Sequence, residues 1–108
     1  MPTEYQIILT TCPDQDMAEK LARQLVNDNL AACVNIVPAL TSIYKWKNEL
    51  ITGSEVLLMI KTRTGCYSDV ETLISGMHPY ELPEIISVPI NNGLPNYLQW
   101  IDSVTGKS

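Results

Sequence analysis

The sequence lacks long hydrophobic runs and has few basic residues, and these shortages exclude two classes of partner. No segment approaches the roughly 18 consecutive apolar residues of a membrane-spanning helix, and the first five residues lack the basic start and apolar stretch of a signal peptide. The seven Lys and Arg residues are scattered among 12 Asp and Glu residues, and the net charge is −5, so no basic stretch predicts nucleic-acid binding. We expect a soluble, cytoplasmic protein that binds neither nucleic acid nor membrane.

Cysteine and histidine are also scarce. The three cysteines, Cys12, Cys33 and Cys66, are an odd number at wide spacing, which fits neither a disulfide framework nor a Cys-x-x-Cys zinc pair. We expect free thiols in a reducing compartment, with Cys33 behaving as a small buried hydrophobic residue. Cys12 is expected to be more accessible, as either a soft-metal ligand or a spectator. The only histidine is His78.

The length and composition predict one domain. The chain has 108 residues, of which 45% are hydrophobic and 18% are charged, as is usual for one globular unit with a single core. We therefore predict a single domain over residues 1–108.

Runs rich in β-branched and apolar residues predict four strands. The second must bend or bulge around Pro38, because proline cannot donate to a ladder within a sheet. A loop over residues 48–53 is expected to return the chain into the third strand, since Asn48 tolerates positive φ. The second and third strands thus form a long hairpin whose tip extends beyond the domain. The predicted strands cover residues 5–12, 31–47, 55–62 and 84–90.

Apolar residues at helical spacing predict three helices. The first covers residues 15–29, with a capping turn at Asp14 and Asn29 as its C-terminal cap. The second begins at Thr64 and ends between Gly76 and Pro79, and the third runs from about Pro95 to Val104.

The order of these elements is typical of a ferredoxin-like α+β domain, a split β-α-β arrangement, here with an additional C-terminal helix. Two helices cover one face of the sheet in such a domain. The other face would carry Tyr44, Trp46, Leu57 and Met59, which are too apolar to leave in water. Self-association is the simplest way to cover them.

The segment from His78 to Glu84 combines the only histidine with two glutamates and two prolines. Each proline fixes its own φ and favours an extended conformation in the residue before it. The segment is therefore a stiff connector that holds polar side chains in place, and it is the first candidate for a functional site.

Several motifs resemble the CutA divalent-cation tolerance family, and the resemblance covers nearly the whole chain. Any one of them is weak evidence, but five in the right order at ordinary spacing are hard to obtain by chance. In chain order they are Leu30–Asn35 followed by Pro38, Ser42–Trp46, Ile60–Thr62, His78–Ile85 and Tyr97–Ile101.

The resemblance implies a compact homotrimer in which the long hairpins extend sheets between neighbouring subunits. It also implies a link to copper and other divalent metals, and a structural likeness to the trimeric PII signalling proteins, which bind small ligands between subunits. It supplies no known enzymatic reaction, and the sequence shows no nucleophile or water-activating group beside its paired carboxylates. We expect a protein that is not an enzyme, has no organic cofactor and binds copper or another divalent cation such as zinc; the alternative is a PII-like adaptor that binds a small ligand or a partner.

His78 is the first candidate metal ligand, because neutral imidazole binds copper and zinc. A carboxylate at Glu84 or a thiolate at Cys12 would complete the site, with further copies supplied by a trimer. The alternative is that His78 bonds a backbone carbonyl and fixes the turn between helix and strand.

Further residues are assigned to a ligand cleft or to the subunit interface, with structural alternatives. Glu81, like Glu84, either coordinates a metal or ligand or forms a hydrogen bond or ion pair with Lys61 or with a neighbouring subunit. Lys61 either neutralises one of these glutamates, binds an anionic ligand in the cleft between subunits, or is solvated. The loop around Tyr80 would face the same cleft. Large aromatic residues at strand and helix spacing usually anchor cores or interfaces, so we predict interface roles for Tyr44, Trp46 and Trp100.

Overall fold

The computed structural model describes residues 4–106. In chain order the elements are β1 (Tyr5–Cys12), α1 (Gln15–Asn27), β2 (Cys33–Trp46), β3 (Glu49–Arg63), a short 3-10 turn η1 (Thr64–Cys66), α2 (Tyr67–Met77), β4 (Ile86–Pro89) and α3 (Pro95–Val104). The predicted α+β order of strands and helices is confirmed.

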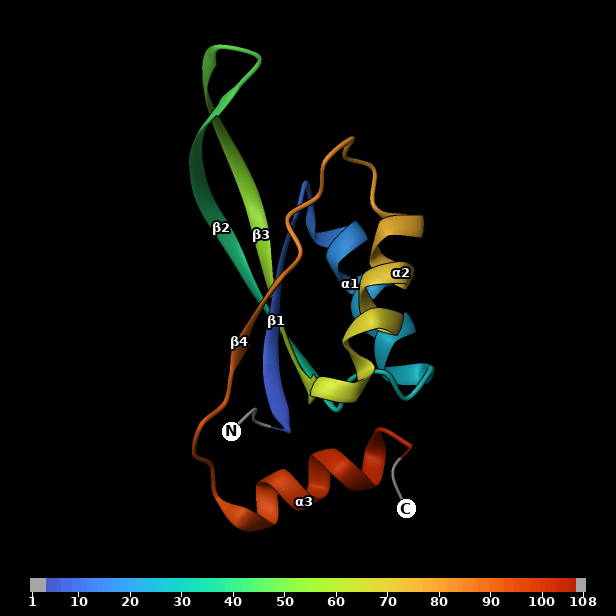
Figure 1. Cartoon of the computed structure of the whole chain (residues 1–108). Helices are drawn as coiled ribbons and strands as arrows, with labels where there is room; N and C mark the ends of the chain where they lie inside the picture. The colour runs from blue at the N-terminus through green and yellow to red at the C-terminus, as the bar shows by residue number, and fades with distance from the viewer. Residues whose placement is uncertain (1–3, 107–108) are drawn as a thin grey trace.

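The strands form one antiparallel sheet in the order β2-β3-β1-β4 (Figure 1). Helices α1 and α2 lie side by side against one face of this sheet, and α3 lies across the end at which β1 begins (Figure 1). The hairpin of β2 and β3 extends well beyond the rest of the molecule (Figure 1). Among residues 4–106, no helix is long and apolar enough to cross a membrane.

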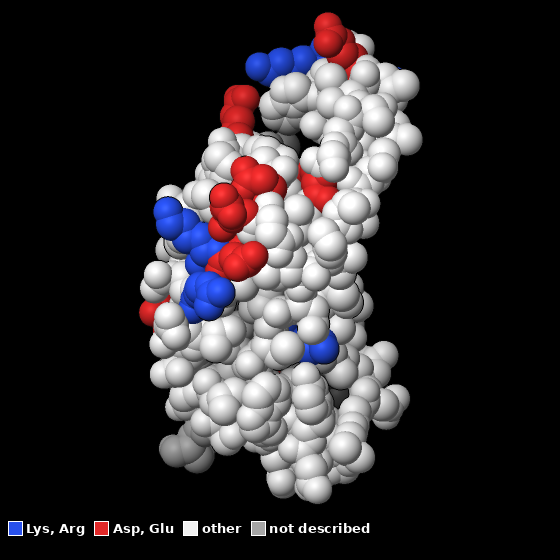
Figure 2. All heavy atoms as spheres, turned by 180° about the vertical axis from the view of Figure 1, so that it is seen from behind, with Lys and Arg blue, Asp and Glu red and all other residues white. Residues whose placement is uncertain are grey.

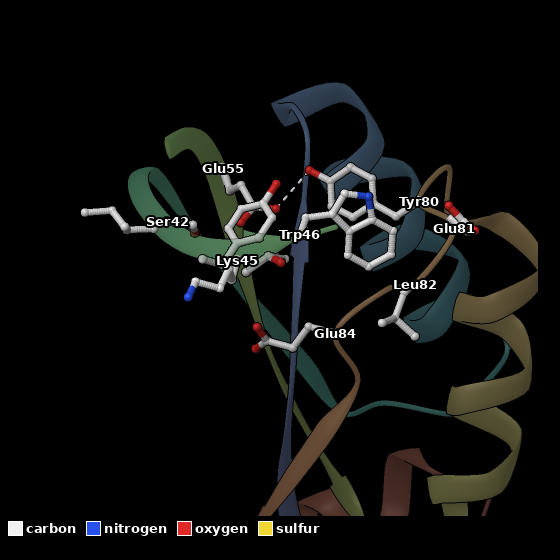
Figure 3. Close-up of a pocket in the computed structure, with 11 residues that line it drawn as sticks. Ser42, Lys45, Trp46, Glu55, Tyr80, Glu81, Leu82 and Glu84 are labelled. Atoms are coloured by element: carbon white, nitrogen blue, oxygen red, sulfur yellow. Dashed lines mark hydrogen bonds between the residues drawn. The ribbon is translucent and has the colours of Figure 1, made fainter. Parts of the chain in front are cut away.

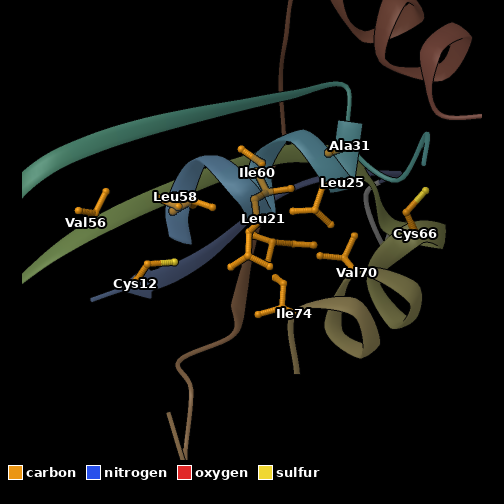
Figure 4. Close-up of a cluster of buried hydrophobic side chains, with 13 residues drawn as sticks. Cys12, Leu21, Leu25, Ala31, Val56, Leu58, Ile60, Cys66, Val70 and Ile74 are labelled. Carbon is orange, nitrogen blue, oxygen red and sulfur yellow. The ribbon is translucent and has the colours of Figure 1, made fainter. Parts of the chain in front are cut away.

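The core lies between the sheet and the two helices because strand side chains alternate between faces. Ile8 of β1 and Ile60 of β3 are register partners, and both are fully buried. Figure 4 shows the helical residues that pack over these strands: Leu21, Leu25, Val70 and Ile74.

Helix α1 begins and ends at capping residues. The Asp14 carboxylate accepts a hydrogen bond from the Met17 amide (2.8 Å), which satisfies one of the free N–H groups of the first turn. The helix ends at Asn27, two residues before the predicted end, and Asn29 follows it at a φ of 59°. Asn29 therefore reverses the chain outside the helix, as an asparagine in the left-handed region commonly does.

The predicted irregularity around Pro38 is confirmed. The register of β2 against β3 shifts between Val37 and Leu40, and Ala39 has a φ of 62°. Pro38, which has no N–H to donate, thus lies in the bulge outside the hydrogen-bonded ladder. The strand continues on both sides of the bulge.

The turn of the hairpin is shorter than the predicted loop over residues 48–53, and that prediction was wrong. Trp46 pairs with Glu49, so only Lys47 and Asn48 connect the strands, with φ values of 50° and 67°. Two successive positive φ values are those of a type I′ turn, which matches the twist of the flanking strands. β3 consequently begins at Glu49 rather than at Glu55.

We expect Asn48→Val to lower the free energy of unfolding by about 1–2 kcal/mol, because a β-branched residue is strained at positive φ. Asn48→Gly is the matched control, since glycine adopts this conformation without strain, and its effect should stay within about 0.5 kcal/mol. Guanidinium unfolding at one protein concentration measures both. Equal losses in the two variants would show that side-chain contacts, rather than backbone conformation, matter at this turn.

Polar contacts hold α3 against the end of the sheet. The Tyr5 hydroxyl donates to Asp102 Oδ2 (2.7 Å), and Arg63 donates from Nε to Thr105 Oγ1 (2.8 Å) and from Nη2 to the Thr105 carbonyl (2.7 Å). Ile101 is fully buried beneath them. These bonds fix the C-terminal helix to β1 and β3.

The sheet face opposite α1 and α2 is apolar and only partly covered within one chain. Ile86 and Val88 of β4 are 52% and 47% exposed, and Leu57 and Met59 of β3 are half-buried. Their partners in register, such as Leu9 opposite Ile86, continue the same surface across β1. The apolar face predicted from the sequence is therefore present.

Charged side chains are intermixed rather than sorted by sign on the side of the molecule seen from behind (Figure 2). The Arg23 guanidinium lies 3.5 Å from the Glu19 carboxylate on α1, with both side chains well exposed. Exposed pairs of this kind contribute little stability. Figure 2 also shows that the lower part of this face is largely uncharged.

Candidate functional site

A cleft of about 680 Å³ lies where the hairpin leaves the body of the molecule. One wall is the hairpin, and the other is the loop between α2 and β4 (Figure 3). Several predicted site residues meet here, together with Glu55, which sequence reasoning missed. The lining residues are Thr11, Ser42, Ile43, Tyr44, Lys45, Trp46, Glu55, Tyr80, Glu81, Leu82 and Glu84.

His78 anchors the loop that forms the second wall. It is 9% exposed, and its Nε2 lies 2.7 Å from the Thr11 carbonyl. The Tyr80 amide donates to His78 Nδ1 (3.1 Å), so Nδ1 is the acceptor and Nε2 carries the proton. Both ring nitrogens are thus engaged with the backbone, which favours the structural alternative over metal binding.

Tyr80 follows His78 and reaches across to the hairpin. Its hydroxyl donates to Glu55 Oε2 (2.8 Å), and its ring lies against the His78 imidazole with centroids 4.6 Å apart. Burial raises the pKa of the Tyr80 phenol strongly, and the bond to Glu55 and its negative charge raise it further. The phenol therefore stays protonated and joins the two walls of the cleft.

One feature of the sequence could have drawn attention to Glu55: it is a carboxylate at the first position of a predicted strand that is otherwise mostly apolar. Its partner lies 25 residues away in the chain, and no local pattern connects the two. The contact places the Tyr80 loop against a cleft within one chain, while the predicted cleft between subunits stays a prediction.

The remaining charged candidates are more exposed. Glu81 lies 4.0 Å from Lys47, both with exposed side chains. Glu84 has no ion pair or hydrogen bond within residues 4–106, so its carboxylate is available to a ligand. Pairing of Lys61 with Glu81 or Glu84, one of the alternatives for these residues, is not seen within residues 4–106; Lys61 Nζ lies 6.0 Å from the centre of the Tyr97 ring, a cation–π contact.

The cysteines are unpaired, but their exposure differs from the expectation. Cys12 was expected to be accessible; it is fully buried among core residues at the end of β1. Burial raises the pKa of the Cys12 thiol to about 11, with smaller contributions from the charges of Asp14 and Glu55. Cys33 was expected to be buried and is instead half-buried.

A model of the family described as CutA1 divalent ion tolerance protein matches residues 6–104. The chain belongs to this CutA1 family.

Individual relatives agree with this assignment. The divalent-cation tolerance protein CutA of Thermus thermophilus is 43% identical over 94% of this chain and 98% of its own length. Protein CutA of Mus musculus is 41% identical over 97% of this chain, which spans only 59% of the mouse protein. The crystal structure of CutA1 from Shewanella sp. SIB1 superposes with a TM-score of 0.96 at 45% identity, covering 99% of this chain and all of the other.

The family's link to divalent cations raises the question of which residues here would hold one. Among the described residues, 4–106, no three His, Cys, Asp or Glu side chains are grouped as metal ligands. His78 is engaged, Cys12 is buried as a thiol, and Glu84 is exposed and free. Within residues 4–106 the three predicted ligands are therefore not brought together in one chain.

The raised pKa of Cys12 predicts its reactivity. Because the thiolate is the nucleophile, alkylation of Cys12 by iodoacetamide should be very slow in the native protein at pH 8 and should rise only as the pH approaches about 11. The thiol is favoured in the folded state, so this group's contribution to stability is present below the ordinary thiol pKa and is lost as the pH rises through about 11. Peptide mapping by mass spectrometry measures the labelling. The urea-unfolded protein at pH 8 is the control, and equal labelling rates in the two states would contradict the burial.

Proposed function

We propose that this protein is a cytoplasmic, homotrimeric cation-binding protein without enzymatic activity, which contributes to tolerance of copper or another divalent cation. The observation that carries this proposal is the Glu84 carboxylate, which lines an acidic cleft, is exposed, and has no ion pair or hydrogen bond within residues 4–106. A trimer would supply the missing donors by presenting three copies of each group.

The apolar sheet face supports the assembly. Ile86 and Val88 are about half exposed, and Leu57 and Met59 lie beside them across the sheet. The aromatic residues Tyr44 and Trp100, at 47% and 41% exposure, were assigned to the interface from the sequence and are free to pack against other chains. Association of subunits through this surface would remove it from water.

The cation would be held chiefly by oxygen donors. Glu84 and Glu81 are the exposed carboxylates of the cleft, and carboxylates bind zinc, although copper and zinc prefer imidazole or thiolate when these are available. With His78 and Cys12 withdrawn into the fold, we expect weak binding that depends on the assembled protein.

Glu84→Gln should weaken zinc or copper binding about tenfold, which corresponds to about 1.4 kcal/mol, because it removes one charged donor while keeping the shape of the side chain. Calorimetry on the assembled wild-type and variant proteins measures the affinity. Glu49→Gln, an equally conservative change at an exposed position on the hairpin, is the matched control and should bind as the wild type does. An unchanged affinity in Glu84→Gln would remove Glu84 from the site.

A second candidate function is that of a PII-like adaptor which binds a small molecule, and the size of the cleft favours it. Pockets that hold small ligands usually measure about 300–1,000 Å³, and this cleft measures about 680 Å³. A ligand that binds only the native protein raises its melting temperature, so a thermal-shift screen separates this function from that of a scaffold.

The three unpaired cysteines support a cytoplasmic location, because thiols tend to be oxidised in the compartments to which proteins are exported. A structurally similar protein from Archaeoglobus fulgidus is described as periplasmic. Cell fractionation with an antibody against this chain decides the compartment, and recovery in an exported fraction would overturn the proposal.

A further inference from the structure

The cleft is far larger than a bare metal ion requires. Its volume of about 680 Å³ has the size of sites for small organic molecules. A metal ion would use only part of it, and the described residues around it do not form a group of metal ligands. The remaining space is large enough for a ligand with an apolar body as well as a charge.

Aromatic and aliphatic side chains make up part of both walls of the cleft. Figure 3 shows Trp46 on the hairpin and Tyr80 and Leu82 on the opposite loop. Tyr44 belongs to β2 of the same hairpin and also lines the cleft. Leu82 is 70% exposed in the single chain, so apolar surface of the loop is open to a ligand. Such walls contribute nothing to binding a hydrated metal ion, but they bury the apolar part of an organic ligand.

The charge of the lining is negative. Three glutamates face one lysine, Lys45, whose side chain points away from the rings of Trp46 and Tyr80 in Figure 3. Glu55 accepts a hydrogen bond from the Tyr80 phenol, and within residues 4–106 neither Glu55 nor Glu84 forms an ion pair. This lining repels an anionic ligand and attracts a cation.

The protein already places one ammonium group against this lining. Lys47 Nζ lies 5.7 Å from the centre of the Trp46 ring and 4.0 Å from the Glu81 carboxylate. An ammonium group between an aromatic face and a carboxylate is a recurrent way of recognising organic cations. Lys47 is not among the lining residues of the cleft, and within the described part of the chain Glu55 and Glu84, which line it, have no ion-paired lysine.

We propose that the cleft binds an organic cation, a primary ammonium group attached to an apolar body, with the ammonium near Glu55 and Glu84 and the body between Trp46 and Tyr80. This inference rests on the second candidate function above and names the class of ligand for that cleft.

Three probes of similar shape and different charge test the inference. The assembled protein is titrated by calorimetry at pH 7.5 with 2-phenylethylamine, 2-phenylethanol and 3-phenylpropionate. We expect the amine to bind at least about tenfold more tightly than the alcohol, and the carboxylate to bind most weakly. Equal binding of amine and alcohol, tighter binding of the carboxylate, or no binding of the amine at millimolar concentration would overturn the inference.

Four variants locate the site. Glu84→Gln and Trp46→Leu should each weaken amine binding about fivefold to tenfold, by removing the charge and the aromatic face respectively. Glu84 is exposed and unpaired, so its replacement leaves the fold intact even if Trp46→Leu does not. Lys45→Met removes a like charge and should strengthen binding severalfold, whereas Glu19→Gln, on α1 outside this cleft, should change nothing. Equal affinities in the wild type, Glu84→Gln and Lys45→Met would place the ligand elsewhere and overturn the assignment.

The same variants separate this inference from the divalent-cation proposal. Indole is not a metal ligand, so Trp46→Leu should weaken binding of the amine and leave the affinity for zinc unchanged. Zinc binding without amine binding would overturn the organic-cation inference alone. Amine binding by a protein that binds neither zinc nor copper would overturn the divalent-cation proposal and support the inference.

Discussion

Val88→Glu is expected to convert the proposed trimer into monomers. Val88 lies on the edge strand β4 opposite Ile7 of β1, on the apolar sheet face, and is 47% exposed in the single chain. A carboxylate buried in an apolar interface without a partner costs several kcal/mol, and a symmetric assembly incurs that cost once in every subunit. Sedimentation velocity at micromolar concentration measures the loss of the larger species.

Val26→Glu is the matched control. Val26 is 42% exposed, a fraction similar to the 47% of Val88. It lies on α1, however, and lines a separate groove against β2. Val26→Glu should leave the state of association unchanged, because it introduces the same carboxylate on α1 and not on the apolar sheet face. A wild-type protein that sediments as a monomer, or an unchanged assembly in Val88→Glu, would show that this face is not the interface.

The fold was accessible from the sequence where local patterns determine structure. The helix α1 was predicted from apolar residues that lie four positions apart, such as Leu21 and Leu25, and both are fully buried. The bulge at Pro38 follows from the missing N–H of proline, and the register shift between Val37 and Leu40 lies there. Features that depend on local sequence, such as this helical period and this bulge, were therefore predicted at the correct residues.

The turn and the site depended on contacts that no local pattern records. The sequence suggested a loop after Asn48, whereas cross-strand pairing from Trp46 with Glu49 onwards draws residues 49–53 into β3. The contact between Tyr80 and Glu55 joins segments that are distant in sequence. Cys12 stands at the end of a strand, a position that favours exposure, but packing by the helices buries it.

Replacing His78 by alanine is expected to lower the free energy of unfolding by about 2–4 kcal/mol. The ring is buried and makes two hydrogen bonds, to the Thr11 carbonyl and from the Tyr80 amide, and alanine leaves both backbone groups without these partners. The loop would also lose the anchor that holds Tyr80 against Glu55, so the cleft should widen. Guanidinium unfolding measures the stability, at a fixed protein concentration because the midpoint of an oligomer depends on it.

The two bonds of His78 can be separated by substitution. Glutamine can place a donor near the position of Nε2, and asparagine can place an acceptor near the position of Nδ1, so each should recover part of the stability that alanine loses. The Nε2 bond, at 2.7 Å, is the shorter of the two, and we expect His78→Gln to recover more than His78→Asn. A loss of less than about 0.5 kcal/mol in His78→Ala, the range of an ordinary surface substitution, would contradict the anchoring role and return the imidazole to the list of candidate cation ligands.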